Sequence, residues 1–249
     1  MDLNIQQVAD GVHFVEGSHT NFALVVEGEA VTVIDTGYPR DRRRVLAAIE
    51  SIGRTPSDCD ALLITHCHVD HTGCAEWLRT EAVLDVHCHA DEEFQVTGGI
   101  KQQISPGALL TRLFKPNVAS FTMNAVLAGG LYRRPVRAVS TFGDGDTLDV
   151  PGAPVAVHTP GHTSGHASFH LPGRGVLVAG DALCNVNLWD PTDIAPQMVP
   201  PPFVHDWDES VRSLDRLAGL EASVVIPGHG EPWRGSPAEA VELAKRRLD

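Results

Sequence analysis

The sequence has no apolar run that approaches the ~18 residues of a membrane-spanning helix. Its first residues, Met1-Asp2-Leu3-Asn4-Ile5-Gln6-Gln7, lack both the basic stretch and the apolar stretch of a signal peptide. The hydrophobic content of 43% is ordinary for a globular chain. We therefore expect a cytoplasmic protein that neither spans nor binds a membrane.

Cysteine is scarce as well. The chain has five cysteines, an odd number, and their spacing fits no disulfide framework. Because we expect no export signal, we predict free thiols in a reducing cytoplasm. The five are Cys59, Cys67, Cys74, Cys88 and Cys184.

Positively charged residues are also few. The chain has 19 Lys and Arg residues against 32 Asp and Glu residues, which gives a formal net charge of −13. Proteins that bind nucleic acids usually carry a basic patch. We therefore predict no nucleic-acid partner and expect a small-molecule substrate. The sequence leaves the oligomeric state open, a homodimer included.

Histidine and aspartate, by contrast, are concentrated in the stretch from Thr65 to Gly73, which reads T-H-C-H-V-D-H-T-G. The apolar run from Ala61 to Ile64 precedes it and is typical of a buried strand. A helix is expected to follow, from Cys74 to Arg79. Open α/β sheets bind their ligands at the carboxyl ends of strands, so this turn is a candidate site.

The spacing inside this stretch suits metal ions. His66 and His68 are two residues apart, so both side chains can face one metal. Asp70 and His71 are adjacent, and a turn can direct them at a second point nearby. Neutral imidazole and carboxylate bind zinc, iron or manganese, so the motif does not select the metal.

Three further segments repeat the same pattern, an apolar run followed by a glycine-flanked His or Asp. In chain order their side chains are His162, Asp181 and His229. Chance does not readily produce four such segments in one chain.

This ordered set resembles the metallo-β-lactamase-fold hydrolase superfamily, and within it the glyoxalase II and lactonase-like branch. The pattern of that superfamily is H-x-H-x-D-H, then a His, a bridging Asp and a final His. The resemblance covers roughly residues 5 to 249. It implies one α/β (α+β) domain over residues 1–249, a four-layer αββα sandwich of two mixed β-sheets flanked by helices.

The resemblance also implies two divalent metal ions, with zinc favoured over iron and manganese. By motif position one metal would be held by His66, His68 and His162, the other by Asp70, His71 and His229, with Asp181 bridging them.

Two cations ~3.5–4 Å apart can share a hydroxide that attacks a carbonyl or phosphoryl centre. Asp70 is also the candidate catalytic residue, because its carboxylate can help move the proton of that hydroxide. We predict a binuclear metal-dependent hydrolase of a small carboxylic ester, thioester or lactone. The alternatives are a phosphoric-ester hydrolase and a non-catalytic metal-binding protein.

The sequence departs from the residue patterns of individual branches of the superfamily, and each departure disfavours the activity of that branch. True β-lactamases of the superfamily generally lack the bridging Asp, so the presence of Asp181 disfavours penicillin hydrolysis. Homoserine-lactone lactonases carry a Tyr at the position of Cys184, a role that Tyr132 could take over. Glyoxalase II enzymes add a C-terminal helical domain, for which the chain after His229 leaves no room.

Residues 92–135 depart from a minimal fold of this kind and predict a helical insertion, with helices at Ala108 to Phe114 and Phe121 to Leu127. The interpretation that we favour is a lid over the metals, and the alternative is a surface elaboration. A second long segment, Asn185 to Val204, is rich in proline and predicts a loop. The side chains expected to line the lid are Phe114, Phe121, Met123 and Tyr132.

Several single residues besides the seven candidate ligands also allow a prediction. Asp35 is either a support for the metal ligands or a turn-forming residue. Cys67 should point away from the metals, and His87 and His89 match no ligand position. We also predict strands at 12–16, 21–27, 30–34 and 83–86, a hairpin of strands at 138–142 and 146–150, and a helix from Ser236 with a capping box to Glu239.

Overall fold

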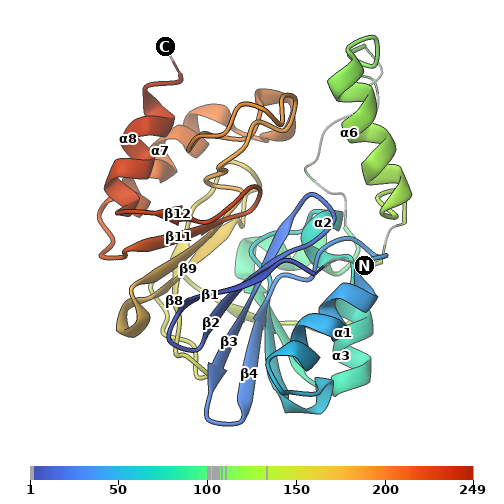
Figure 1. The fold of residues 1–249 in the computed structure, drawn as a ribbon, viewed down its shortest axis with the longest axis vertical. Coiled ribbons are helices and arrows are strands. Elements are labelled where there is room, and N and C mark those ends of the chain that lie inside the picture. The colour runs from blue at the N-terminus through green and yellow to red at the C-terminus, as the bar shows by residue number, and fades with distance from the viewer. Residues whose placement is uncertain are drawn as a thin grey trace.

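The computed structural model describes residues 3–99, 102, 107, 109, 111–132 and 134–248. Its described residues form two β-sheets that pack face to face, with helices on both outer faces (Figure 1). The predicted four-layer αββα sandwich is therefore confirmed.

The first sheet has seven strands in the order β1-β2-β3-β4-β5-β6-β7. Strands β1 to β4 form an antiparallel meander, and β4 to β7 pair in parallel. The strands are β1 Ile5–Ala9, β2 Val12–Glu16, β3 Asn21–Glu27, β4 Ala30–Ile34, β5 Cys59–Leu63, β6 Asp85–His89 and β7 Ser140–Phe142.

The second sheet has five strands in the order β12-β11-β10-β9-β8. The pairs are antiparallel except for β10 with β11, which is parallel. The strands are β8 Val155–His158, β9 Ala167–Leu171, β10 Val176–Gly180, β11 Val224–Pro227 and β12 Trp233–Arg234.

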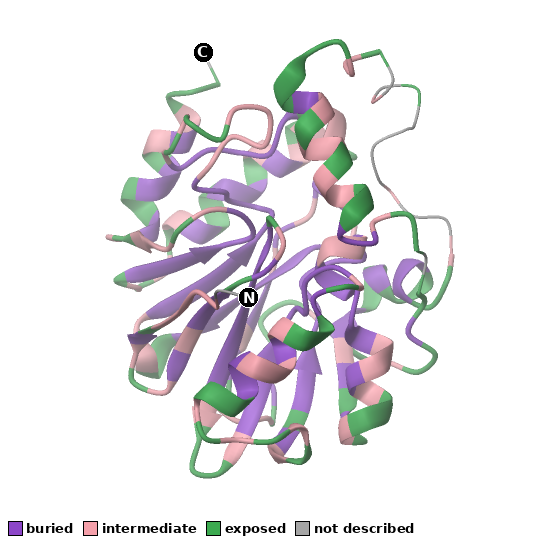
Figure 2. Ribbon diagram, turned by 45° about the vertical axis from the view of Figure 1, so that its right-hand side comes forward, coloured by how far each residue is buried: buried purple, intermediate pink, exposed green. Residues whose placement is uncertain are grey.

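Three apolar cores lie between the four layers. One lies between the first sheet and the helices α1 and α3, a second between the two sheets, and a third between the second sheet and the helices α7 and α8. Figure 2 shows that most of the strand residues are buried. The helices are α1 Arg42–Ser51, α2 Val69–Thr72, α3 Ala75–Ala82, α4 Glu93–Val96, α6 Pro116–Leu127, α7 Trp207–Ala218 and α8 Pro237–Lys245.

Local sequence signals account for several boundaries. The Ser236 hydroxyl accepts from the Glu239 amide and the Glu239 carboxylate accepts from the Ser236 amide, so the predicted capping box of α8 is confirmed. The predicted strand at 83–86 begins too early, because Val83 adopts a left-handed conformation with φ +58° at the end of α3. The predicted hairpin is also wrong. β7 pairs with β6, and residues 146–150 contribute an isolated bridge from Thr147 to Val155.

Helix α6 stands apart from the sandwich, above the edge at which the loops of both sheets meet (Figure 1). The predicted helix at Phe121 to Leu127 is confirmed but starts earlier, at Pro116. The other predicted helix of this segment includes residues 108 and 110, which lie outside the described residues. Among the described residues, no helix combines the length and hydropathy needed to cross a membrane.

Candidate metal centre

The seven predicted ligands all lie just beyond the carboxyl ends of strands. The stretch after β5 contributes four of them, and the segments after β8, β10 and β11 contribute one each. Since these strand ends meet at one edge of the sandwich, residues more than 160 positions apart are brought together. They are His66, His68, Asp70, His71, His162, Asp181 and His229.

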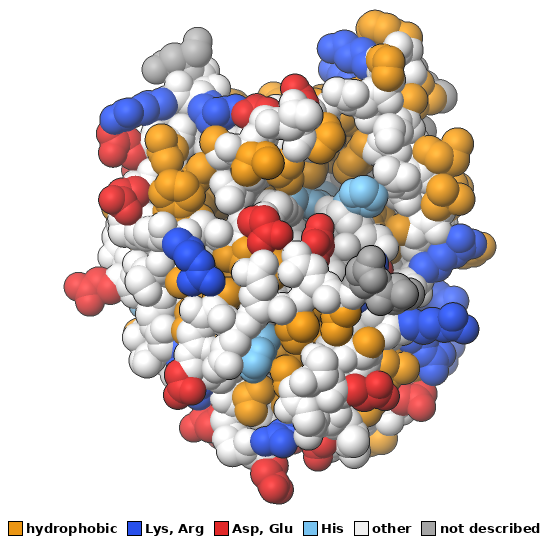
Figure 3. Space-filling view, viewed as in Figure 1, with side chains coloured by type: hydrophobic (Ala, Val, Ile, Leu, Met, Phe, Trp, Pro, Cys, Tyr) orange, Lys and Arg blue, Asp and Glu red, His pale blue; other side chains and the backbone are white. Residues whose placement is uncertain are grey.

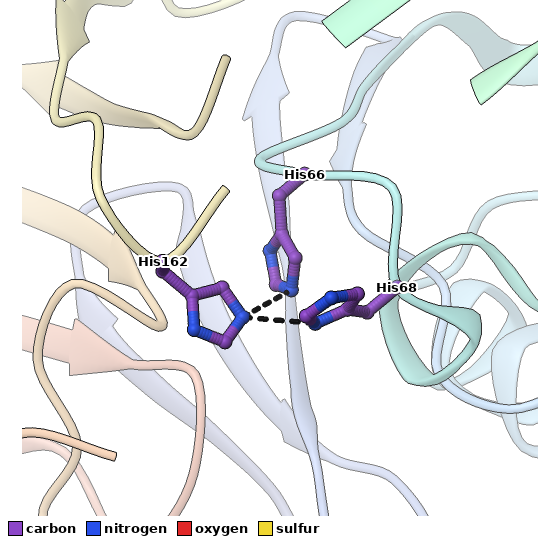
Figure 4. A group of neighbouring side chains, drawn as sticks. All are labelled: His66, His68 and His162. Carbon is purple, nitrogen blue, oxygen red and sulfur yellow. Dashed lines mark hydrogen bonds between the residues drawn. The ribbon is translucent and has the colours of Figure 1, made fainter. Parts of the chain in front are cut away.

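Three imidazoles converge through their ring nitrogens (Figure 4). His162 Nε2 lies 3.1 Å from His66 Nε2 and 2.9 Å from His68 Nδ1. Tetrahedral zinc with Zn–N bonds of about 2.0–2.1 Å would separate its ligand nitrogens by about 3.4 Å. The observed separations are close to that value, so a modest outward shift would seat one cation among the three rings.

A second group lies beside the first. His71 Nε2 lies 3.8 Å from Asp70 Oδ2, and His229 Nε2 lies 3.7 Å from the same oxygen. Asp181 lies between the two groups, with Oδ1 at 3.2 Å from His71 Nε2 and Oδ2 at 3.4 Å from His162 Nε2. Its Oδ2 is also 3.3 Å from His229 Nε2. The carboxylate of Asp181 therefore contacts imidazoles of both groups, as a bridging ligand would.

The electrostatics of the two groups differ. Burial, and then the neighbouring imidazoles, hold the pKa of His66 and of His162 well below its usual range, so both rings are neutral and offer lone pairs. Burial also acts to lower the pKa of His71, but the carboxylates of Asp181, Asp35 and Asp70 raise it well above the usual value. This part of the site thus favours a positive charge, which a divalent cation would supply.

One buried polar atom also fits a bound cation. Asp181 Oδ1 is buried and has no hydrogen-bond partner, although His71 Nε2 lies 3.2 Å away. An unsatisfied carboxylate oxygen inside a protein is costly, and metal coordination removes that cost. The donor set of imidazoles and carboxylates suits first-row divalent metals without selecting one of them.

Asp35 supports the ligand stretch, which favours the first of its two predicted roles. Its Oδ1 accepts from the Thr65 amide at 2.9 Å, and its Oδ2 accepts from the Thr65 hydroxyl at 2.7 Å. His71 Nδ1 lies 2.8 Å from the same Oδ2, which leaves Nε2 of that ring facing Asp181. Asp35 itself has φ +62°, an unfavourable conformation for a non-glycine residue, so its placement is maintained by these bonds.

Glu92 is a buried carboxylate that joins the two loops carrying the three converging imidazoles. Its Oε1 accepts from the Cys67 amide at 2.7 Å, between His66 and His68. Its Oε2 accepts from the Thr163 hydroxyl at 3.0 Å and from the Gly165 amide at 2.9 Å, next to His162. Burial raises the pKa of Glu92, and the hydrogen bonds from Cys67, Thr163 and Gly165 act in the opposite direction.

His166 is a further residue that sequence reasoning missed. Its ring is fully buried, with Nδ1 at 2.8 Å from the Thr159 hydroxyl and Nε2 accepting from the Asp181 amide at 3.0 Å. Burial lowers the pKa of His166 to about 3, so the ring is neutral and can accept that bond. The signal in the sequence was its position four residues after His162, within the same loop.

The other predictions for single residues are largely met. Cys67 is buried, and its Sγ lies 3.5 Å from Gln95 Oε1. His89 takes no part in the centre. Its ring stacks on that of His158 with centroids 3.9 Å apart, and Nδ1 accepts from the Asp91 amide at 3.2 Å. His158 Nε2 bonds the carbonyl of Ser164. His89, Asp91 and His158 thus form a second group of possible metal ligands, in which one nitrogen of each ring already has a hydrogen bond.

A cavity of about 250 Å³ opens onto the centre and is lined on its far side by apolar residues. Histidine side chains are visible in the hollow between the C-terminal helices and α6 (Figure 3). Phe121 of α6 lines the cavity and packs against Trp189 and Phe203, at centroid distances of 5.8 and 5.7 Å. The apolar lining consists of Val69, Leu109, Phe121, Ala125, Val126, Leu131, Leu188 and Phe203.

Three of the four residues predicted to line the lid do not line this cavity. Phe114, Met123 and Tyr132 are 79%, 59% and 54% exposed, because they lie on faces of the segment directed to solvent. The lining tyrosine is Tyr38, which follows β4 and was not predicted. Cys184 is fully buried.

Comparisons with known proteins agree with this geometry. The family model described as the metallo-beta-lactamase superfamily matches residues 15–229. The chain is 28% identical to a probable metallo-hydrolase of Bacillus subtilis (strain 168), over 96% of this chain and 92% of that protein. It is 31% identical to an uncharacterized protein of Mycobacterium leprae, over 71% and 70% of the two chains.

Solved structures show the same fold. A metallo-beta-lactamase family protein of Thermus thermophilus superposes with a TM-score of 0.66 at 25% identity, covering 96% of this chain and 80% of that one. A B3 metallo-beta-lactamase with an active-site glutamic acid superposes with a TM-score of 0.70 at 19% identity, covering 99% and 89%.

Proposed function

Because the chain belongs to the metallo-beta-lactamase superfamily of metal-dependent hydrolases, we propose that it cleaves a small carboxylic ester, thioester or lactone. The observation that carries this proposal is the cavity, in which an apolar wall faces the convergent imidazoles and carboxylates. A substrate with an apolar acyl or alkyl group would fill the wall side and present its reacting carbonyl to the polar side.

In this proposal the two groups of ligands hold two divalent metal ions, most readily zinc. His66, His68 and His162 would hold one, Asp70, His71 and His229 would hold the other, and Asp181, which contacts imidazoles of both groups, would be shared. Bound cations of this kind supply Lewis acidity and lower the pKa of water.

The side chains of the chain itself position the reactants and move the proton. Asp70 lines the cavity with a carboxylate that is 15% exposed, so a water molecule in the cavity can reach it. We assign to the Asp70 carboxylate the acceptance of the proton that the attacking water loses and its return to the leaving oxygen or sulfur. The bonds of Asp35 and Glu92 keep the ligand loops in place without contact with substrate.

Helix α6 and the segment around it, residues 92–135, form the proposed lid. Phe121, Ala125 and Val126 of α6 line the cavity directly above the ligands. The lid excludes water from the reacting centre and determines how long an acyl group can be accommodated.

A phosphoric ester is a poorer fit. No Lys or Arg is among the described residues that line the cavity, so nothing besides the metals would neutralise the phosphate. A non-catalytic role is also disfavoured, since the cavity leads directly to the ligands. The thiols support a cytoplasmic location, because all five cysteines are free and buried.

The test is a hydrolysis screen on the metal-loaded protein, with lactones, thioesters, carboxylic esters and phosphodiesters side by side. We expect turnover of the carboxylic substrates, increasing with the length of an apolar acyl group up to the size of the cavity. Turnover of phosphodiesters alone would contradict the proposal.

A further inference from the structure

Tyr38 enters the cavity from the end of the turn that follows β4. Its amide donates to Asp41 Oδ2 at 2.9 Å, and its carbonyl accepts from Cys74 Sγ at 3.1 Å, so its backbone is held on both sides. Its ring lies against Gly130, where an added Cβ would be 3.3 Å from Tyr38 Cε1. Gly130 follows α6, so the ring is enclosed between the sandwich and the lid.

The hydroxyl of Tyr38 has no hydrogen-bond partner among the described residues, although the side chain is only 4% exposed. The other lining hydroxyl, that of Thr122, donates to the Val118 carbonyl at 2.7 Å within α6. Tyr38 is thus the lining residue, among those described, whose hydroxyl proton is uncommitted.

The phenol is protonated at neutral pH, since the ordinary pKa of a tyrosine is about 10. Burial of the side chain raises the pKa of Tyr38 further. A protonated phenol in a partly enclosed cavity is a hydrogen-bond donor, and leaving it without an acceptor is costly. Its acceptor must therefore come from what enters the cavity.

We propose that the Tyr38 phenol donates a hydrogen bond to the substrate oxygen on which negative charge develops during hydrolysis. The inference rests on the proposed function for the identity of the substrate, and on the cavity for the position of the donor. The phenol keeps its proton throughout, so it stabilises charge and is not an acid or a base. A donor fixed beside the reacting group before the reaction starts stabilises the transition state more than the ground state.

The first experiment compares Tyr38→Phe with Tyr132→Phe in the metal-loaded protein. Tyr132 is exposed and outside the cavity, so its variant is the matched control. For Tyr38→Phe we expect kcat to fall by about 10²-fold, the typical effect of losing one such donor, with KM changed much less. Metal content and Tm should stay at wild-type values, because the hydroxyl makes no bond to the described protein.

The second experiment does not depend on turnover. A hexyl methylphosphonate monoester, whose anionic oxygens imitate the charged transition state, is titrated into each variant by calorimetry, and a neutral hexanamide serves as the comparison. We expect Tyr38→Phe to weaken phosphonate binding by about 10-fold or more and to leave hexanamide binding unchanged. Wild-type kcat together with wild-type phosphonate affinity in Tyr38→Phe would overturn the inference.

The two experiments separate this inference from the proposed function. If the wild-type protein hydrolyses no carboxylic substrate, the proposed function fails. The phosphonate titration still decides whether Tyr38 is a donor to an anionic oxygen. A lower Tm in Tyr38→Phe, with unchanged phosphonate affinity, would show a structural role and would also overturn the inference.

Discussion

The two sides of the cavity are built in different ways. On the ligand side, buried polar residues hold one another through hydrogen bonds, and His66, His71 and His162 are almost inaccessible to solvent. On the wall side, α6 contributes apolar side chains, and two of its neighbours, Phe114 and Leu131, are each 79% exposed. In the function that we propose, the sandwich supplies the reacting groups and the segment around α6 supplies the apolar wall that selects the substrate.

The described residues attach the wall at the end of α6 and through Phe121. Arg40 holds the end of α6 by donating from Nη1 to the Leu127 carbonyl at 2.7 Å and from its amide to the Ala128 carbonyl at 3.1 Å. On the other side, Phe121 packs against Trp189 and Phe203. Aromatic pairs of this type contribute about 0.5–1.5 kcal/mol each beyond their buried area.

The largest effect is expected on the ligand side, from Asp181→Ala. Asp181 lies within 3.4 Å of imidazoles from both groups, so its loss should remove at least one of the two metals per chain. Since metal catalysis contributes several kcal/mol, activity should fall by about 10³-fold or more. Elemental analysis after dialysis measures the metal content, and the exposed Asp85→Asn is the control. A wild-type ratio that stays near one metal after supplementation would contradict the two-metal arrangement.

The next largest effect tests whether the hydrogen bonds of Asp35 and Glu92 to the ligand loops position the imidazoles. We call these bonds the hydrogen-bonded frame. Both carboxylate oxygens of Glu92 accept hydrogen bonds from the ligand loops. Glu92→Gln keeps the side-chain volume, but its NH2 group would face one of these donors and could not accept from it. We expect metal affinity to fall by about 10- to 100-fold, as is typical when a group supporting metal ligands is altered. The d–d spectrum of the cobalt-substituted protein should change as well.

Glu93→Gln is the matched control for this variant, since Glu93 is the exposed neighbour in the chain. Unchanged metal affinity and an unchanged cobalt spectrum in Glu92→Gln would show that the frame does not position the imidazoles. The contrast between the two sides of the cavity would then be much weaker.

The same contrast explains what could be predicted from the sequence. The clustering of the seven candidate ligands was predictable because each follows an apolar strand, and strands that run in the same direction bring such positions to one edge. The capping box of α8 was predictable because it depends on residues three positions apart. These signals are local, or they follow from strand order alone.

Residues whose role depends on distant partners were not predictable. Glu92 and His166 act through backbone amides of other loops, and the sequence offers a signal for His166 alone, its position four residues after His162. Tyr38 lines the cavity because the segment around Gly130 closes over it. The prediction that Phe114, Met123 and Tyr132 line the cavity was wrong. Composition shows that a segment is apolar, but it does not show which face of the segment turns inward.

A smaller effect is expected on the wall side, from Phe121→Ala. Phe121 is partly buried, so truncation should remove about 1–2 kcal/mol of apolar contact, or roughly 5- to 30-fold in kcat/KM. The loss should be greater for long acyl groups than for short ones, and metal content should not change. Phe114→Ala is the matched control, since Phe114 is exposed. Equal losses for short and long substrates would show that Phe121 does not form the substrate wall.

The smallest expected effect is on the reactivity of the cysteines. None of them lies in residues 92–135, so their labelling does not report on the wall side. All five are free and buried. Burial raises the pKa of Cys59, Cys74 and Cys88 to about 12, and that of Cys184 well above its usual value. The native protein at neutral pH should therefore react very slowly with a thiol reagent, because almost no thiolate is present.

Denatured, unreduced protein should titrate five thiols, and a count of three or fewer would reveal a disulfide. Metal removal is the sharper probe. Cys67 lies between His66 and His68, and its amide is tied to Glu92, so loss of the metal should loosen this loop first. We expect a chelator to speed the labelling of Cys67 by a few fold, with Cys59 unaffected at the far end of β5. Mass spectrometry of the labelled peptides distinguishes the two sites. Equal labelling with and without the chelator would mean that the hydrogen-bonded frame keeps the ligand side closed by itself, and that the metals add little to its rigidity.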